Sequence, residues 1–199
     1  MGCNLIAVRY TVNHRNNIMK KVLAIILLTF GSSIIYAQGI FTGKGNTSLD
    51  VGVGLTHANA FNSLSYHLGT SIQGVVDIGL NYVGTVPNNI IGNTLSLDYY
   101  IKKDSLYGIL LNSASVIFNN TSAFLVGFSV YGKLIFSNRF PFNIAPCVSL
   151  GYLIAKDISL GIGLAMEKKI NESFSIILTP AVNAGIRTQI VLGLELIYQ

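Results

Sequence analysis

The sequence has few charged residues, only two cysteines, and no apolar run long enough to cross a bilayer as a helix. Charged residues make up 11% of the 199 residues, whereas hydrophobic residues make up 51%. The surface of a soluble domain usually needs about a quarter or more of its residues charged. The chain therefore has too few charges to solvate the outside of a soluble sandwich or barrel.

The cysteines and the other reactive residues exclude several kinds of site. Cys3 lies in a segment that we expect to be removed, which leaves Cys147 alone and excludes an internal disulfide. No group of residues has the spacing of a metal site, and neither cysteine has the context of a lipid anchor. The Gly-X-Gly pairs at Gly52 and Gly161 lie inside predicted strands, where they cannot form a phosphate-binding turn. The sequence predicts no cofactor.

Residues 19–37 have the three-part layout of an export signal. Two lysines precede an apolar stretch at residues 22–30, small residues follow, and Ile35 and Ala37 occupy the positions that determine cleavage. A spanning helix needs roughly 20 apolar residues, and this stretch is interrupted at Gly31. We expect residues 1–18 to be an upstream extension missing from the mature protein, and residues 38–46 to be a short periplasmic lead.

The basic character of the chain belongs mostly to the expected leader. Thirteen Lys and Arg residues oppose eight Asp and Glu residues, but four of the basic residues precede residue 38. The mature chain would therefore carry nine basic and eight acidic residues, with a net charge near +1. Attraction to nucleic acid is not supported.

What the chain does contain is alternation between apolar and polar residues. In the last segment, Ile190, Leu192, Leu194 and Leu196 share one face of a predicted strand, opposite Gln189, Gly193 and Glu195. From residue 47 to residue 199 the chain divides into about ten such segments, each near the length that crosses a bilayer at a tilt. In the fourth segment the alternation places Lys102 inward with Ser96 and Asp98. The segment from Leu106 to Phe118 is the weakest, because both faces carry large apolar residues.

This pattern predicts an all-β fold, a closed antiparallel up-and-down barrel in a membrane. Lipid tolerates no unpaired sheet edge, so a sheet that crosses it must close on itself. We expect ten strands, with eight as the alternative, and both termini in the periplasm. Pro146 and Pro180 each remove a backbone donor, and we expect a bulge or a bend at both.

Aromatic residues are predicted to gather in two belts at the membrane interfaces. The expected outer belt consists of Tyr66, Tyr82, Phe118, Phe124 and Tyr152. The expected inner belt consists of Tyr99, Tyr107, Phe136, Phe142, Phe174 and Tyr198.

Seven charged residues are predicted to face the lumen as a polar network: Asp50, Asp77, Asp98, Lys133, Glu167, Arg187 and Glu195. Narrow barrels are usually filled by their own side chains, and unpaired charges in a dry interior are costly. We therefore favour a largely plugged lumen, and keep a narrow channel for small solutes as the alternative.

The C-terminal residues Gly193, Leu196 and Tyr198 resemble the terminal signal by which outer-membrane barrels are recognised for insertion. With the export signal, the chain resembles a small bacterial outer-membrane β-barrel of the OmpA/OmpX type, and the junction at residues 36–39 is similar to secreted proteins of Bacteroidota. The resemblance implies outer-membrane lipids and the barrel-insertion machinery as partners, with no specific ligand identified.

The leading functional hypothesis is a non-enzymatic barrel with a structural or surface-interaction role. A narrow channel is the first alternative. A lipid or peptide hydrolase at the outer rim is the second, because His57 lies at the predicted outer end of the first strand, near Asn59 and Ser63, where it could act as a general base. No acidic partner lies nearby in the sequence, so we predict that the protein is not an enzyme.

Overall fold

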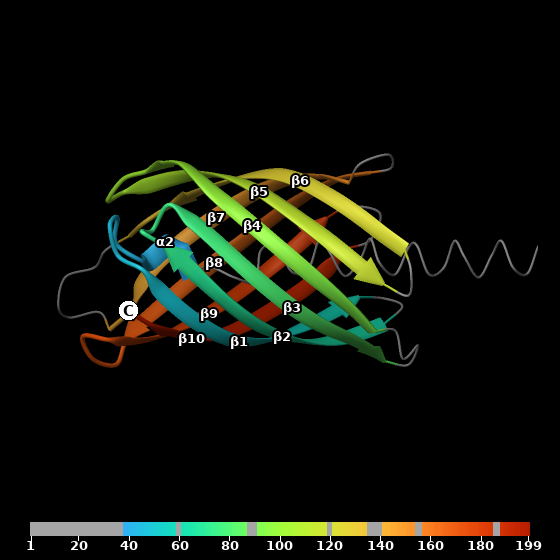
Figure 1. The fold of residues 1–199 in the computed structure, drawn as a ribbon, viewed down its shortest axis with the longest axis horizontal. Coiled ribbons are helices and arrows are strands. Elements are labelled where there is room, and N and C mark those ends of the chain that lie inside the picture. The colour runs from blue at the N-terminus through green and yellow to red at the C-terminus, as the bar shows by residue number, and fades with distance from the viewer. Residues whose placement is uncertain are drawn as a thin grey trace, which may run out of the picture.

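The computed structural model describes residues 38–58, 61–86, 91–118, 121–134, 141–153, 157–184 and 188–199. Within these ranges the chain forms one short helix, α2 (Gln38–Phe41), and ten strands (Figure 1). The strands are β1 (Ser48–Ala58), β2 (Phe61–Ile72), β3 (Val76–Val86), β4 (Ile91–Lys103), β5 (Tyr107–Phe118), β6 (Thr121–Gly132), β7 (Asn143–Leu153), β8 (Asp157–Lys169), β9 (Phe174–Ala184) and β10 (Gln189–Tyr198).

The strands form a closed barrel in which every neighbouring pair is antiparallel. β1 pairs with β10 from Leu49↔Tyr198 to Ala58↔Gln189, so the first and last strands complete the ring. The predicted ten-strand barrel is confirmed. The chain enters β1 and leaves β10 at the same mouth, where α2 also lies (Figure 1). We call this the α2 mouth.

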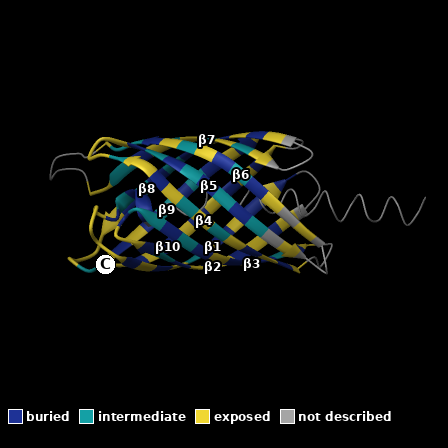
Figure 2. Cartoon of the chain, turned by 45° about the horizontal axis from the view of Figure 1, so that its top comes forward, coloured by how far each residue is buried: buried dark blue, intermediate teal, exposed yellow. Residues whose placement is uncertain are grey.

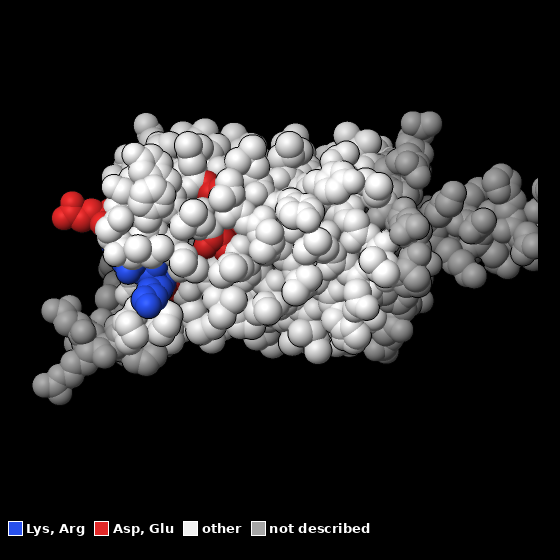
Figure 3. Space-filling model, turned by 90° about the horizontal axis from the view of Figure 1, so that it is seen from below, with Lys and Arg blue, Asp and Glu red and all other residues white. Residues whose placement is uncertain are grey.

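The alternation seen in the sequence places apolar side chains on the outside of the barrel. The large exposed apolar side chains are between 37% and 67% exposed, whereas neighbouring polar residues such as Asp50 and Glu195 are 1% exposed. Buried and exposed residues therefore alternate along the strands (Figure 2). On the face drawn in Figure 3, most of the wall lacks charged side chains. Such an exterior suits lipid and would be poorly solvated by water.

None of the helical structure in the described ranges is long and apolar enough to cross a membrane.

One of the two aromatic belts is clear. Tyr107, Phe174 and Tyr198 lie at strand ends next to the α2 mouth, and the rings of Phe174 and Tyr198 are 5.1 Å apart. At the opposite end, Phe124 and Tyr152 lie near strand ends, as expected. Tyr66 was wrongly expected near the outer rim, because β2 begins at Phe61 and Tyr66 falls in its middle, paired with Tyr82. Phe136 and the side chain of Phe118 lie outside the part of the chain that the structure describes.

The expected bulges at the two prolines are not formed. The pairing of β7 with β8 runs through Pro146 without a shift, and that of β9 with β10 runs through Pro180. On its other side each proline interrupts the pairing without changing the register. Between β6 and β7 the pairing stops at Cys147 and resumes at Ile144, and between β8 and β9 it omits Pro180. The missing N–H is therefore accommodated by omitting a pairing rather than by inserting a residue.

The irregularity in register lies instead in β4. Tyr100 pairs with Leu110 but Lys102 pairs with Ile109, so Ile101 is an extra residue. A bulge of this kind shifts the alternation of side chains beyond it. Lys102 is consequently exposed and contacts Tyr107 outside the barrel, contrary to the predicted inward position. Lys103 turns into the α2 mouth in its place.

The larger cluster of buried apolar residues in the described lumen lies next to the α2 mouth, and a smaller one, Ala181 and Val191, lies farther in. Leu110 of β5 belongs to the larger cluster, which explains why the weakly alternating segment has apolar residues on both faces. The larger cluster consists of Ile40, Tyr100, Leu110, Tyr131, Ala145, Ala165, Ile177 and Ile197. Tyr131 is 1% exposed, and its ring lies directly over the backbone of Gly108.

Substitution Gly108→Ala should destabilise the barrel by about 1–3 kcal/mol, the usual cost of overpacking. A Cβ at this position would lie 2.3 Å from the ring of Tyr131, so the ring would have to leave its place in the cluster. Urea unfolding of the protein refolded into lipid vesicles measures the loss. Gly84→Ala is the matched control, because a Cβ there has no atom within 4 Å. Equal stability of the two variants would contradict this account.

Candidate functional site in the lumen

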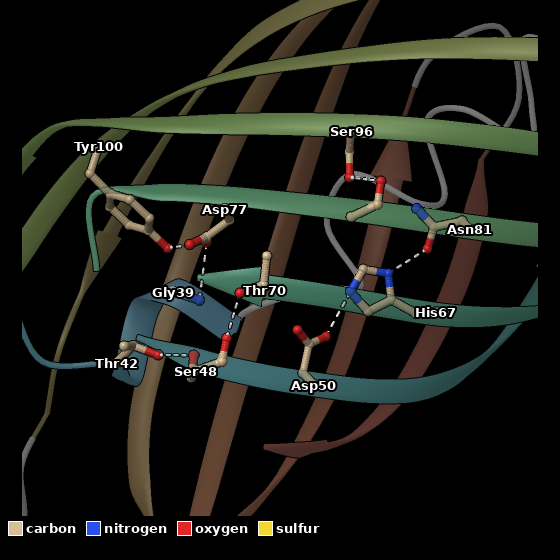
Figure 4. A network of polar contacts seen from close by, with 11 residues as sticks. Gly39, Thr42, Ser48, Asp50, His67, Thr70, Asp77, Asn81, Ser96 and Tyr100 are labelled. Carbon is tan, nitrogen blue, oxygen red and sulfur yellow. Dashed lines mark hydrogen bonds and ion pairs between the residues drawn. The ribbon is translucent and has the colours of Figure 1, made fainter. Parts of the chain in front are cut away.

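The lumen contains a chain of buried polar contacts across β1, β2 and β3. Nε2 of His67 lies 2.7 Å from Oδ2 of Asp50, and both side chains are fully buried. Nδ1 of His67 lies 2.7 Å from Oδ1 of Asn81. A carboxylate can only accept, so Nε2 of His67 donates to Asp50. Figure 4 shows the three side chains in one line.

This chain of contacts depends on a glycine opposite the histidine. A Cβ at Gly79 would lie 2.6 Å from Cε1 of His67 and 2.6 Å from Oγ of Ser96. Because Gly79 has no side chain, the imidazole ring of His67 on β2 can lie close to the backbone of β3, next to Ser96 of β4. The sequence shows that His67 faces inward, but not that Asp50 and Asn81 meet it.

A second group of contacts holds α2 inside the α2 mouth. The backbone N–H of Gly39 donates to Oδ2 of Asp77 at 3.0 Å, and the hydroxyl of Tyr100 donates to the same oxygen at 2.9 Å (Figure 4). Nζ of Lys103 donates to the carbonyl oxygens of Gly39 and Gly74, and lies 4.4 Å from the centre of the Tyr100 ring.

The segment that follows α2 is also attached to the barrel. Oγ1 of Thr42 lies 2.8 Å from Oγ of Ser48, and the N–H of Gly45 donates to the carbonyl of Gln73 at 2.8 Å. Ile40 is 7% exposed and joins the apolar cluster. The expected periplasmic lead at residues 38–46 therefore folds into the mouth of the barrel. We call these residues the cap.

The predicted lumen residues occupy different parts of the wall. Asp50, Asp77, Glu167 and Glu195 are buried, and Asp98 is partly exposed. Asp77 and Asp98 face each other on β3 and β4, and Oε2 of Glu167 accepts a hydrogen bond from Nδ2 of Asn143 at 2.8 Å. Arg187 lies outside the described residues.

Lys133 follows β6 and is partly buried beside Tyr131, whose ring centre is 5.8 Å from Nζ. Burial lowers the pKa of the Lys133 ammonium, while the negative charge of Glu167 acts in the opposite direction. Lys103 and Tyr100 were not among the predicted site residues. The bulge that directs Lys103 inward has no signal in the sequence.

The rim histidine has no acidic contact in the structure described. Nδ1 of His57 lies 2.7 Å from Oδ1 of Asn62, at an exposed position. Ser63 pairs with Thr56 and is 6% exposed, and Asn59 lies outside the described residues. No group of three or more His, Cys, Asp and Glu side chains in the described part could hold a metal ion.

No protein-family model and no curated protein matches this sequence. Among solved structures, the translocator domain of the autotransporter NalP from Neisseria meningitidis matches with a TM-score of 0.57 at 8% identity, covering 89% of this chain and 97% of that domain. The NanC porin matches with a TM-score of 0.47 at 8% identity, covering 76% and 99%, and the β-domain of the Bordetella autotransporter BrkA with 0.43 at 9%, covering 77% and 98%.

At these identities the likeness concerns the fold. The architecture is that of the outer-membrane β-barrels. Together with the apolar exterior described above, it places the protein in the bacterial outer membrane, in agreement with the sequence prediction.

His67→Ala should destabilise the barrel by about 3–5 kcal/mol, because it removes the imidazole that contacts the buried Asp50 carboxylate. His57→Ala removes a histidine from an exposed contact and should change stability by less than about 0.5 kcal/mol. Urea unfolding in lipid vesicles compares the two variants. A cost for His67→Ala no larger than that for His57→Ala would show that the Asp50–His67 pair is not a stabilising contact.

Proposed function

We propose that this protein is a non-enzymatic, narrow channel for small solutes across the outer membrane. The observation that carries the proposal is the partial exposure of inward-facing residues on β4, β6 and β7. These residues are Ser96, Asp98, Ser129, Cys147, Ser149 and Gly151. The residues before and after them in each strand point outward, toward the membrane. The exposed surface of these six residues therefore lies inside the lumen.

The width of the barrel supports this proposal. An eight-stranded barrel is just wide enough for side chains to fill, and the diameter grows with the number of strands. This barrel has ten strands, and much of its inner wall carries side chains no larger than serine. Small inward-facing residues occur on every strand of the middle section, among them Gly54, Ser65, Gly69, Gly79, Ala114, Gly127, Gly161, Gly163, Ala181 and Gly193.

The plugged structural barrel is the second candidate. The fully buried His67–Asp50 pair and the cap both favour it, because they close part of the lumen. The two candidates differ in one measurable property, which is whether water and ions pass through the lumen beside β4, β6 and β7. The hydrolase alternative has less support, because the contact of His57 is an amide that cannot relay a proton.

We also propose the other features expected from the sequence. These are an export signal at residues 19–37, a periplasmic location of the α2 mouth, contact of the outer wall with outer-membrane lipids, and recognition of Gly193, Leu196 and Tyr198 by the barrel-insertion machinery. A closer relation to OmpA/OmpX-type barrels and an origin in Bacteroidota also stay predictions.

Gly39→Ala should raise the conductance of the protein in planar lipid bilayers. A Cβ at residue 39 would lie 2.1 Å from Oδ2 of Asp77, so either the cap or the Asp77 side chain must move, and the contact that holds α2 in the mouth is disturbed. Lys44→Ala is the matched control, because Lys44 is in the cap but exposed. We expect small, steady conductance steps for the wild type and the control, and larger steps for Gly39→Ala.

Silence of all three proteins in the bilayer, with heat-modifiable gel migration confirming that each is folded, would overturn the channel and leave the plugged barrel. Conductance that is equal in all three would retain the channel but show that the cap does not restrict it.

Tyr198→Ala should reduce the amount of folded protein in the outer membrane, because it removes the aromatic residue of the proposed assembly signal. Tyr66→Ala is the matched control, since Tyr66 and Tyr198 are 52% and 51% exposed on the same outer surface. Heat-modifiable migration in membrane fractions measures assembly. An equal reduction in both variants would indicate a general loss of aromatic surface instead of a specific signal.

A further inference from the structure

We infer that the lumen admits small cations in preference to anions of the same size. This inference rests on the proposed channel and adds the charge class of its solute. It is carried by five inward-facing carboxylates, which we call the carboxylate belt: Asp50, Asp77, Asp98, Glu167 and Glu195.

The carboxylate belt is distributed around the wall of the barrel, in the half next to the α2 mouth. Its members come from β1, β3, β4, β8 and β10, and cross-strand pairing relates four of the five. Asp98 faces Asp77 directly. Glu195 of β10 and Glu167 of β8 both pair with Ile177 of the strand between them. The carboxylates therefore lie on several sides of the lumen. Asp98 is partly exposed, and the other four are buried in the wall around it.

The positive charges near the belt are fewer. His67 is engaged with Asp50, and Lys103 and Lys133 are the two lysines that turn toward the mouth in the part of the chain that the structure describes. Lys103 is held by the carbonyl oxygens of Gly39 and Gly74. The remaining exposed charges, such as the Lys102–Asp104 pair, lie outside the barrel. Among the residues that the structure describes, carboxylate groups that face the lumen therefore outnumber lysine ammonium groups.

The hydrogen bonds of Glu167 also support the cation preference. Oε2 of Glu167 accepts from Asn143, whereas Oε1 of this residue, which is 2% exposed, makes no hydrogen bond with the described residues. An amide donor does not neutralise a carboxylate, so the negative charge stays on the lumen wall. Clefts with charge of one sign and low-dielectric walls raise the local concentration of the opposite ion, and rings of Asp and Glu are typical of cation-selective pores.

Cys147 provides a reporter inside the lumen. It is partly exposed on the inner wall of β7, and Cys147→Ser gives the background for any other thiol. Two methanethiosulfonates of similar size, one with a 2-aminoethyl group and one with a 2-sulfonatoethyl group, differ in charge. In each reaction the thiolate attacks the sulfur of the reagent, a mixed disulfide forms, and methanesulfinate leaves.

The measurement is the modification rate of folded protein in lipid vesicles, followed by mass spectrometry and divided by the rate of each reagent with a free small thiol. We expect the cationic reagent to react on the order of tenfold faster than the anionic one after this correction, within the range of electrostatic focusing. The double variant Asp98→Asn, Glu195→Gln should bring the ratio toward one. Asp104→Asn, on an exposed turn, should leave it unchanged.

A second measurement is the reversal potential of the conducting protein under a potassium chloride gradient, which should move toward the potassium potential in the wild type and toward zero in the double variant. Equal corrected rates for the two reagents, or a reversal potential at zero in the wild type, would overturn the cation preference while the channel stands. No modification of Cys147 by either reagent would show that solutes do not enter, and would remove the proposed channel together with the preference.

Discussion

The pairing of β1 with β10 is the constraint on which the rest of the structure depends. In a bilayer no water is present to bond with free backbone groups, so an open sheet edge would cost several kcal/mol for each unpaired group. Pairing from Leu49↔Tyr198 to Ala58↔Gln189 removes both edges. Once the ring is closed, every strand has one face toward lipid and one toward the lumen, and the alternation of apolar and polar residues follows from this.

The same closure explains how the barrel accommodates its irregular residues. A proline in an open sheet can lie on an edge strand, but a closed ring offers no edge. Pro146 and Pro180 are tolerated through local gaps in pairing that keep the register of the ladder on either side. A register shift at either proline would have turned the apolar side chains beyond it toward the lumen. The bulge in β4 does shift the alternation, but it lies close to the strand end, where only Lys102 and Lys103 are affected.

The two parts of the lumen have different chemical character. Next to the α2 mouth, the apolar cluster around Ile40 and Tyr131 packs against the cap, and Asp77 and Lys103 bond the backbone of Gly39. Farther in, the wall beside β4, β6 and β7 carries small and partly exposed residues. The proposed narrow channel, restricted at the α2 mouth, is consistent with both parts of the lumen. It also gives a use to carboxylates that would be costly in a dry interior.

The sequence alone determined the class of fold and the inward position of five acidic residues, because these follow from an alternation with a period of two and from the small number of charges. It favoured ten strands over eight, and the closed ring decided for ten. It also indicated that Asp50 and His67 face the same interior. Tertiary structure decided which side chains meet: His67 with Asp50 and Asn81, and Gly39 with Asp77. It also decided that Lys103 instead of Lys102 enters the mouth, and that residues 38–46 fold into the barrel. These contacts join residues on different strands, or depend on a bulge that leaves the composition of the segment unchanged, so local periodicity carries no information about them.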